Sequence, residues 1–317
     1  MHKRFVNQCT IDISILPGGP ILIKSGKEGA DPTKPDMEFV ETYHAGGRSI
    51  YLPGSSLKGA IRAHAERIVR TVGRDRKPNS NNSNTVWASN PLNLDELKYL
   101  DSITDTREIY RQSSFTDQMF GNIAIASRIR IEDAYPVDPK QLKLEERNGV
   151  AIDRVFGSVA VGPFNYQVCT SGEFKTKIHL KNFSLAQLGL IGLVLRDLDE
   201  GWFGLGFAKS RGLGMVEIKL NSAVVQYPGC VLENEQISSI GAQKQWSNKH
   251  LLGAGVFLES EERESYGFPA DDEQETTVTA ESMKFGFGVQ LQFQGDVKVQ
   301  DLFMRAVSSW RRRLAVV

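Results

Sequence analysis

Two short segments of the chain, about 150 residues apart, combine glycine with small hydroxyl groups and cations. A glycine-flanked backbone can approach a phosphate chain closely, while hydroxyl groups and cations can bind it. The candidate phosphate ligands are Ser55, Ser56 and Lys58 in residues 53–59, and Lys209, Ser210 and Arg211 in residues 204–214. Together the segments favour a nucleic acid as ligand, although the first alone fits a capped surface helix equally well.

The first segment opens a predicted helix over about residues 56–70, with Leu57, Ile61 and Ala65 on one apolar face. The free N–H groups and the dipole at a helix start favour an anion. Lys58 lies in this first turn, where its charge opposes the dipole, so we expect a phosphate to neutralise it. Arg62, one turn later, is a further phosphate candidate. The alternative interpretation is that these cations do not bind phosphate and only form a solvated basic face.

Periodicity and turn residues then predict the elements that position these segments. Strands are expected at about 8–16, 20–24, 39–44, 48–52, 128–134, 174–180 and 215–220, and a second helix, opened by a capping box at Ser184, at about 184–198. The resulting order β, α, β, β, α, β over residues 8–220 predicts an α+β, ferredoxin-like core. Sheets of this kind are common platforms for RNA.

Two regions fall outside this core. Residues 71–113 form an expected insertion with an asparagine-rich stretch at 79–84 and a polar helix near 94–100. Residues 221–317 form an expected C-terminal extension that ends in a strand and an amphipathic helix. Within it, the acidic loop 259–281 holds nine acids and one base, which leaves 37 bases against 29 acids elsewhere. A basic body with an acidic patch suits an RNA-binding protein that also meets basic partners.

The composition is that of a globular protein, with 317 residues, 24% charged residues and a net charge of zero. We find no apolar run long enough to cross a membrane and no export signal after the first residues. Cys9, Cys169 and Cys230 are odd in number and far apart, which predicts reduced thiols and a cytoplasmic location.

Several motifs resemble the RAMP superfamily, the ferredoxin-like RNA-binding proteins of CRISPR systems. Residues 53–62 resemble its helix-opening signature, and residues 204–214 its glycine-rich loop. Residues 119–134 are similar to the stretch leading into the central strand, and residues 151–154 to the start of the thumb hairpin of backbone (Csm/Cmr-like) subunits of type III effector complexes. The insertion and the extension depart from a minimal backbone subunit and suggest a specialised, type III-D-like one.

The resemblance implies a subunit that binds guide RNA and cleaves complementary target RNA with a divalent metal ion, magnesium. The family's catalytic aspartate lies in the loop after the first strand, here residues 25–36, and Asp36 matches it as catalytic residue and metal ligand, with Asp31 as the fallback. The thumb hairpin is expected at about 147–172, with Arg154 and Phe156 as RNA contacts. The implied partners are guide RNA, target RNA, other RAMP subunits and a large signalling or DNA-cutting subunit.

Two alternative functions stay open on the sequence. The first is a non-catalytic scaffold or capping subunit, which the acidic stretch and the C-terminal additions favour. The second is a metal-independent endonuclease that processes guide RNA with histidine as acid or base. His44, beside a glycine turn, and His64, on the predicted helix, are its candidates. His64 follows the apolar stripe and is expected to be packed, whereas His44 is expected to be exposed.

Overall fold

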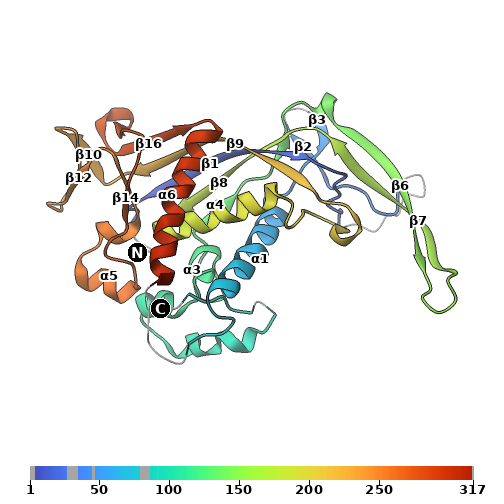
Figure 1. The fold of residues 1–317 in the computed structure, drawn as a ribbon, viewed down its shortest axis with the longest axis horizontal. Coiled ribbons are helices and arrows are strands. Elements are labelled where there is room, and N and C mark those ends of the chain that lie inside the picture. The colour runs from blue at the N-terminus through green and yellow to red at the C-terminus, as the bar shows by residue number, and fades with distance from the viewer. Residues whose placement is uncertain (1–3, 27–34, 45–46, 79–85, 91, 316–317) are drawn as a thin grey trace.

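The computed structural model describes residues 4–26, 35–44, 47–78, 86–90 and 92–315. Its main feature is a seven-stranded antiparallel sheet with helices gathered on one face (Figure 1). The strands of this main sheet are β1 (Gln8–Pro17), β4 (Ile129–Ile131), β5 (Tyr135–Pro136), β8 (Phe174–Lys181), β9 (Val216–Tyr227), β15 (Glu281–Ser282) and β16 (Val289–Gln294). Their order is β15-β16-β9-β1-β8-β4, and β5 also pairs with β8. The chain is therefore a mixed α+β protein.

Three long helices cover the apolar face of the main sheet: α1 (Gly54–Val72), α4 (Leu185–Asp199) and α6 (Asp296–Ala315). The central one, α4, is buried on almost every side and begins at the predicted capping box. The Gln187 N–H donates to Ser184 Oγ, and the Ser184 N–H donates to the Gln187 side chain. In the part of the chain that the structure describes, no helix has the length and hydropathy needed to cross a membrane.

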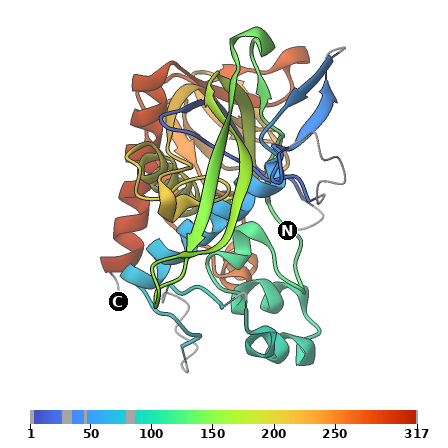
Figure 2. The same cartoon turned by 90° about the vertical axis from the view of Figure 1, so that its right-hand side faces the viewer.

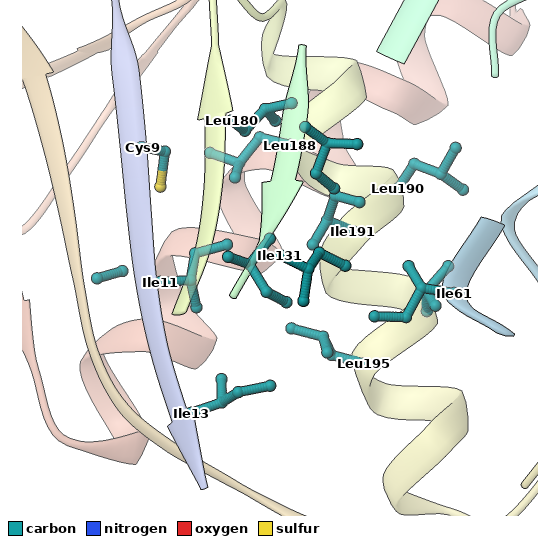
Figure 3. Packing of buried hydrophobic residues seen from close by; sticks show 14 of the residues in the cluster. Cys9, Ile11, Ile13, Ile61, Ile131, Leu180, Leu188, Leu190, Ile191 and Leu195 are labelled. Carbon is teal, nitrogen blue, oxygen red and sulfur yellow. The ribbon is translucent and has the colours of Figure 1, made fainter. Parts of the chain in front are cut away.

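Strand β1 runs through the centre of the sheet because its side chains alternate between apolar and polar. Cys9, Ile11, Ile13 and Ile15 are at most 2% exposed, and polar residues separate them. This period of two directs one apolar face toward the helices. Figure 3 shows Cys9, Ile11 and Ile13 of this strand on the side of the sheet that faces Ile61 of α1 and leucine and isoleucine side chains of α4.

Along the chain the core runs β1, α1, β4, β8, α4, β9, and across the sheet its strands lie in the order β9-β1-β8-β4. This is the predicted sequence of elements, although β4 is shorter and β9 longer than expected. Both β1 and β4 pair antiparallel with β8, so they run parallel to each other. Their carboxyl ends therefore lie at the same end of the main sheet, which we call the loop end.

A long hairpin of β6 (Lys143–Ile152) and β7 (Val159–Ser171) projects away from the body in Figure 1 and lies in front of it, toward the viewer, in Figure 2. We call it the thumb hairpin, and it coincides with the hairpin expected at about 147–172. A short helix, η2 (Pro139–Gln141), precedes it. Its base is fixed to the body by an antiparallel bridge between Ile21 and Cys169 and a parallel bridge between Met37 and Tyr166.

Residues 20–24, predicted as a strand, make only isolated bridges. Ile21, Leu22 and Ile23 are all at most 7% exposed, so the segment is buried on both sides instead of alternating. Its backbone forms hydrogen bonds with several separate segments and not with one continuous strand. For example, the Phe207 N–H donates to the Leu22 carbonyl at 2.7 Å. A regular strand does not form because these neighbours come from different parts of the chain.

The strands predicted at about 39–44 and 48–52 correspond to β2 (Glu41–His44) and β3 (Gly47–Ile50), which pair antiparallel as a hairpin, and residues 45–46 between them lie outside the described residues. The insertion that follows α1 contains η1 (Leu94–Ser102), a 3-10 helix where a polar helix was predicted, and α2 (Thr106–Gln112). Helix α3 (Asp117–Phe120) closes at Gly121. The asparagine-rich stretch at 79–84 lies outside the described residues.

The C-terminal region completes the same core instead of forming a separate body. The predicted boundary near residue 220 falls inside β9, β16 pairs with β9, and α6 packs on α4. The other elements of this region are β10 (Cys230–Glu233), β11 (Gln236–Ser239), β12 (Gln245–Ser247), β13 (His250–Leu252), η4 (Ala254–Phe257), α5 (Ser260–Tyr266), β14 (Glu273–Glu275) and η5 (Lys284–Gly286). The expected terminal strand and helix correspond to β16 and α6.

The acidic segment 259–281, predicted as a loop, contains helix α5 and strand β14. Its Asp272 is buried and accepts the N–H groups of Leu185 and Gly255 at 2.8 and 3.0 Å. Leu185 is the first residue of α4, so this carboxylate lies at the positive end of the helix dipole. At least one acid of the segment therefore stabilises the fold.

All three cysteines are free and buried, in agreement with the expected reduced thiols. Burial raises the pKa of Cys169 to about 11 and that of Cys230 to about 12. A thiol with such a pKa stays protonated at neutral pH and is a poor nucleophile. The cysteines therefore belong to the core and not to a reactive site.

The close packing of α4 against α6 gives a test of the fold. A Cβ at Gly189 would lie 2.8 Å from backbone atoms of Ala306 and Val307. We expect Gly189→Ala to lower the free energy of unfolding by about 1–3 kcal/mol, because α6 must move away. The measurement is urea unfolding followed by circular dichroism.

The matched control is Gly59→Ala on α1, where a Cβ would meet no atom within 4 Å. This change should raise the free energy of unfolding by up to about 1 kcal/mol, since alanine loses less backbone entropy than glycine. Equal stability of the Gly189→Ala protein and the unchanged protein would contradict the close α4–α6 contact.

Candidate nucleic-acid interface

The start of α1 is fixed to the end of β4 by a close backbone approach. A Cβ at Gly54 would lie 2.3 Å from the Ile131 carbonyl oxygen, so only glycine fits there. The Gly54 N–H donates to Asp133 Oδ1 at 2.7 Å. The helix start therefore already has a carboxylate of the protein at its positive end, which the sequence reasoning did not foresee. Ser55 and Ser56 remain exposed beside it.

Lys58 is half-buried in the first turn of α1, and its Nζ donates to Ser127 Oγ at 2.8 Å. Burial and then the positive charge of Arg62 lower its pKa. Among the described residues no carboxylate forms an ion pair with it. Lys58 therefore remains a cation without a charged partner, as its proposed contact with phosphate requires.

Arg62, by contrast, is occupied by the protein itself. Its guanidinium donates to Glu66 Oε1 and Asp117 Oδ1, both at 2.9 Å, and to the Gly121 carbonyl oxygen at 3.0 Å. Glu66 also accepts from Arg70, and Asp117 from Ser89. Both carboxylates are buried, so the guanidinium compensates charges that would otherwise be unpaired inside the protein. The expectation that Arg62 binds phosphate is therefore corrected to a structural role.

A cavity of about 630 Å³ opens next to this ion-pair network, between α1 and residues 120–127. Arg62 and Glu66 line it together with apolar groups of Phe120, Ile123 and Ile125. Because the charged groups in its wall are paired with each other, the cavity offers no free charge to a phosphate chain.

The glycine-rich loop at 204–214 closes on itself and on the segment that follows β1. The Leu205 N–H donates to the Gly214 carbonyl at 2.9 Å, and the Gly214 N–H donates to the Pro20 carbonyl at 2.9 Å. Gly206 has a φ of +77°, and a Cβ there would lie 2.2 Å from the Leu22 carbonyl oxygen. Glycine is therefore required where the loop passes over this segment.

The tip of the glycine-rich loop is the short helix η3 (Lys209–Arg211), whose three side chains are all exposed. Within the described part of the chain, neither Lys209 nor Arg211 forms an ion pair, although the Arg211 guanidinium lies 5.1 Å from the centre of the Phe207 ring. The loop thus presents two cations and a hydroxyl to solvent.

The tip of the thumb hairpin is an ordered turn with exposed apolar side chains. Asp153 Oδ1 accepts the N–H groups of Val155 and Phe156 at 2.7 and 2.9 Å, and these bonds, that of Phe156 first, lower its pKa. Val155 and Phe156 are 82% and 83% exposed, and Arg154 beside them is exposed as well. An apolar tip held in one conformation can wedge between stacked bases.

Asp36 is exposed and lies against the thumb hairpin. Its Oδ2 accepts the Asn165 N–H at 2.9 Å, and the next residue, Met37, exchanges backbone hydrogen bonds with β7. Asp31, the fallback, lies outside the described residues. The described residues include no group of three or more His, Cys, Asp or Glu side chains able to hold a metal ion. Asp36 therefore fits a magnesium ion only where RNA or water supplies the other oxygen ligands.

The loop end of the main sheet brings these features together. Residues 20–24 contact the glycine-rich loop through Pro20 and Leu22 and the thumb hairpin through Ile21. The Val40 N–H donates to the Ile23 carbonyl, which places the chain after Asp36 there as well. Helix α1 begins at the carboxyl end of β4, at this same end of the sheet. Figure 1 shows the thumb hairpin extending from it.

The two histidines lie in different environments. His64 is buried, its Nε2 lies 2.7 Å from Asp197 Oδ2, and its ring stacks on Phe203, so it is packed as expected. His44 is exposed, also as expected, but its ring stacks on Tyr135 with ring centres 3.6 Å apart. Sequence reasoning missed this contact, and the Asp133 cap of α1, because both join residues far apart in the chain.

Comparison of the sequence with models of known protein families gave a match. The family model of the RAMP superfamily (RAMPs) matches residues 18–217, which include the start of α1, the thumb hairpin and the glycine-rich loop. Among curated proteins no match was found.

The different surroundings of Arg62 and Lys58 give a test of their roles. We expect Arg62→Met to lower the free energy of unfolding by about 3–5 kcal/mol, because it leaves buried Asp117 and Glu66 without this cation. Lys58→Met, the matched control on the same helix, removes one hydrogen bond to Ser127 and should cost no more than about 1.5 kcal/mol. Urea unfolding measures both. Equal losses for the two variants would refute the structural role of Arg62.

Proposed function

Because the chain belongs to the RAMP superfamily, the RNA-binding proteins associated with CRISPR systems, we propose that it is a backbone-type subunit of a type III CRISPR ribonucleoprotein. In this function it binds guide RNA and cleaves complementary target RNA. The observation that carries the proposal is that the family match spans the start of α1, the thumb hairpin and the glycine-rich loop, which meet at the loop end. Its partners are guide RNA, target RNA, other RAMP subunits and a large signalling or DNA-cutting subunit.

The core arrangement supports this assignment. We infer a ferredoxin-like βαββαβ unit from the strand order β9-β1-β8-β4, with α1 between β1 and β4 and α4 between β8 and β9. The thumb hairpin is inserted between its β4 and β8. Because many functions use this fold, the function is argued from the site.

Guide RNA binds, in this proposal, along the loop end. Lys209 and Arg211 approach the phosphates from the glycine-rich loop with Ser210 between them, and Lys58 approaches from α1 beside Ser55 and Ser56. These cations have no carboxylate partner among the described residues, so a phosphate chain can neutralise them. Arg154 and Phe156 at the tip of the thumb hairpin contact the guide–target duplex, where the apolar ring interrupts base stacking.

Asp36 is the proposed catalytic residue. The 2′-oxygen of the target RNA bonds to the adjacent phosphorus while the bond from phosphorus to the 5′-oxygen breaks. The 2′-hydroxyl loses its proton and the leaving 5′-oxygen gains one, which gives a 2′,3′-cyclic phosphate and a 5′-hydroxyl with no co-reactant. A magnesium ion held by Asp36 would stabilise the negative charge that develops on the phosphate oxygens. One carboxylate oxygen of Asp36 is held by Asn165, which fixes its orientation and leaves the other oxygen for the ion. The thumb hairpin and the loop end hold the RNA in line for attack.

A non-catalytic scaffold is the second candidate function. The observation that favours it is that Asp36 belongs to no group of three or more His, Cys, Asp or Glu side chains in the described part of the chain. In a scaffold the same cations bind guide RNA, and target RNA is protected without being cut.

The first test concerns RNA binding. Lys209→Gln and Arg211→Gln should each weaken binding to all RNA sequences and reduce the slope of log K against log salt concentration by about 0.7–1. Fluorescence anisotropy with labelled RNA over a series of salt concentrations measures this slope. The matched control is Lys298→Gln, an exposed lysine in the first turn of α6. An equal change in slope for all three variants would argue against a specific RNA path.

The second test concerns cleavage. In the reconstituted complex, Asp36→Asn should reduce cutting of complementary RNA at least about 100-fold and leave guide binding unchanged. Asparagine can still accept the Asn165 N–H, so the base of the thumb hairpin keeps its geometry. A chelator should abolish cutting by the unchanged complex, and Asp101→Asn, an exposed aspartate in η1, should have no effect.

The outcomes of this test separate the candidate functions. Metal-dependent cutting that persists in the Asp36→Asn complex would refute the role of Asp36. Protection of the target without cutting by the unchanged complex would support the scaffold. Cleavage of repeat RNA by the isolated chain in the presence of chelator would identify a guide-processing enzyme instead.

A further inference from the structure

An aromatic group of three side chains lies on the surface beside the start of α1. The rings of His44 and Tyr135 are parallel within 6°, with centres 3.6 Å apart, and the Tyr51 ring lies 5.9 Å from Tyr135 at an angle of 17°. The three residues come from β2, β5 and the segment between β3 and α1. We call this group the aromatic stack.

The outer ring of the aromatic stack is open to solvent. His44 is exposed, whereas Tyr135 and Tyr51 are half-buried. Tyr135 covers one face of the His44 ring at 3.6 Å, and among the described residues no ring stacks on the other face. By comparison, the stacked rings of Tyr110 and Phe268 are at most 8% exposed and serve a core. Within the described residues, the aromatic stack therefore ends in an exposed ring that carries no second ring on its outer side.

Hydrogen bonds hold the aromatic stack in place relative to α1. The Tyr135 hydroxyl donates to Asp133 Oδ2 at 3.3 Å, and the same carboxylate accepts the Gly54 N–H at the start of α1. Leu52 and Ala134 exchange backbone hydrogen bonds at 2.9 and 2.8 Å. One carboxylate and one backbone bridge thus connect the stack to the first turn of α1, which carries Ser55, Ser56 and Lys58.

The charges around the aromatic stack suit a neutral planar ligand. On the hairpin that carries His44, Glu41 and Arg48 pair with each other at 2.7 Å. The carboxylate of Asp133 is satisfied by its two donors. A nucleobase is planar and uncharged, and every base has a π face that can stack on an aromatic ring whatever its identity.

We propose that the exposed face of His44, backed by Tyr135, stacks on one unpaired nucleobase of the RNA bound at the loop end. The inference rests on the proposed function, because it deepens the RNA site at the start of α1. It assigns His44 a binding role in place of the acid or base role considered from the sequence. The stack is indifferent to base identity and adds affinity without adding salt dependence.

The experiment compares two ligands of about ten nucleotides, an oligouridylate and an abasic ribose–phosphate chain of the same length. With the full chain, His44→Ala should weaken oligouridylate binding about 5- to 100-fold and leave binding of the abasic chain unchanged. The slope of log K against log salt should stay that of the unchanged protein. His44→Phe should restore oligouridylate affinity, since phenylalanine supplies a stacking ring.

The matched control is Tyr43→Ala. Tyr43 is the preceding residue on β2 and is 79% exposed, but its ring stacks on no other ring in the described part of the chain. The Tyr43→Ala variant should bind both ligands as tightly as the unchanged protein does. If His44 only held the hairpin in place, His44→Ala would weaken both ligands by the same factor, and the inference would be wrong.

Other outcomes separate this inference from the proposed function. If the unchanged chain binds neither ligand, the proposed function fails at the level of RNA binding. If it binds both ligands and Lys209→Gln weakens both while His44→Ala weakens neither, the function stands and the stacking inference is overturned. Loss of assembly with sister subunits in His44→Ala, at unchanged RNA affinity, would identify a protein contact and overturn the inference as well.

Discussion

The segment of residues 20–24, in which Ile21, Leu22 and Ile23 are buried, is the constraint on which the arrangement of the loop end depends. Buried backbone N–H and C=O groups must find hydrogen-bond partners, and this segment makes only isolated bridges instead of a regular strand ladder. Its groups instead bond Cys169 of the thumb hairpin, Phe207 and Gly214 of the glycine-rich loop, and Val40 of the chain that follows Asp36. Three segments from distant parts of the sequence are thereby held around one stretch of main chain. The need to satisfy these backbone hydrogen bonds thus determines how the loop end is arranged.

The charges of this region divide into two groups with different roles. Arg62 and Arg70 form a network with the buried carboxylates of Glu66 and Asp117, where each charge offsets another within the protein. Lys58, Lys209 and Arg211 have no such partner in the described residues and lie where solvent or a ligand reaches them. Residue type alone does not distinguish the paired cations from the unpaired ones, since both groups contain arginine. A cation is available to an external anion only where the fold supplies no internal one, and this difference favours the glycine-rich loop over the face of α1 that carries Arg62.

The C-terminal region lies beyond the family match but contributes to the same body. Strand β16 extends the main sheet next to β9, and α6 packs so closely on α4 that Gly189 has no room for a side chain. Asp272 reaches the start of α4 from the acidic segment. The helical face of the sheet is thus closed by residues from both ends of the chain. The loop end and the thumb hairpin remain outside this packing, and they are the parts offered to RNA in the proposed function.

The sequence by itself determined the features that depend on neighbouring residues. The capping box at Ser184, the alternation along β1, the order of strands and helices and the exposed cations between the glycines of residues 204–214 were all predictable, since local patterns encode them. Only the tertiary structure decided which distant groups meet. Arg62 donates to Asp117, which lies 55 residues later in the sequence. Asp36 accepts from the backbone N–H of Asn165, 129 residues later, and His44 stacks on Tyr135. A periodicity shows which face of an element is apolar, but it carries no information on which side chain of another element will lie opposite, because that depends on how the whole core packs.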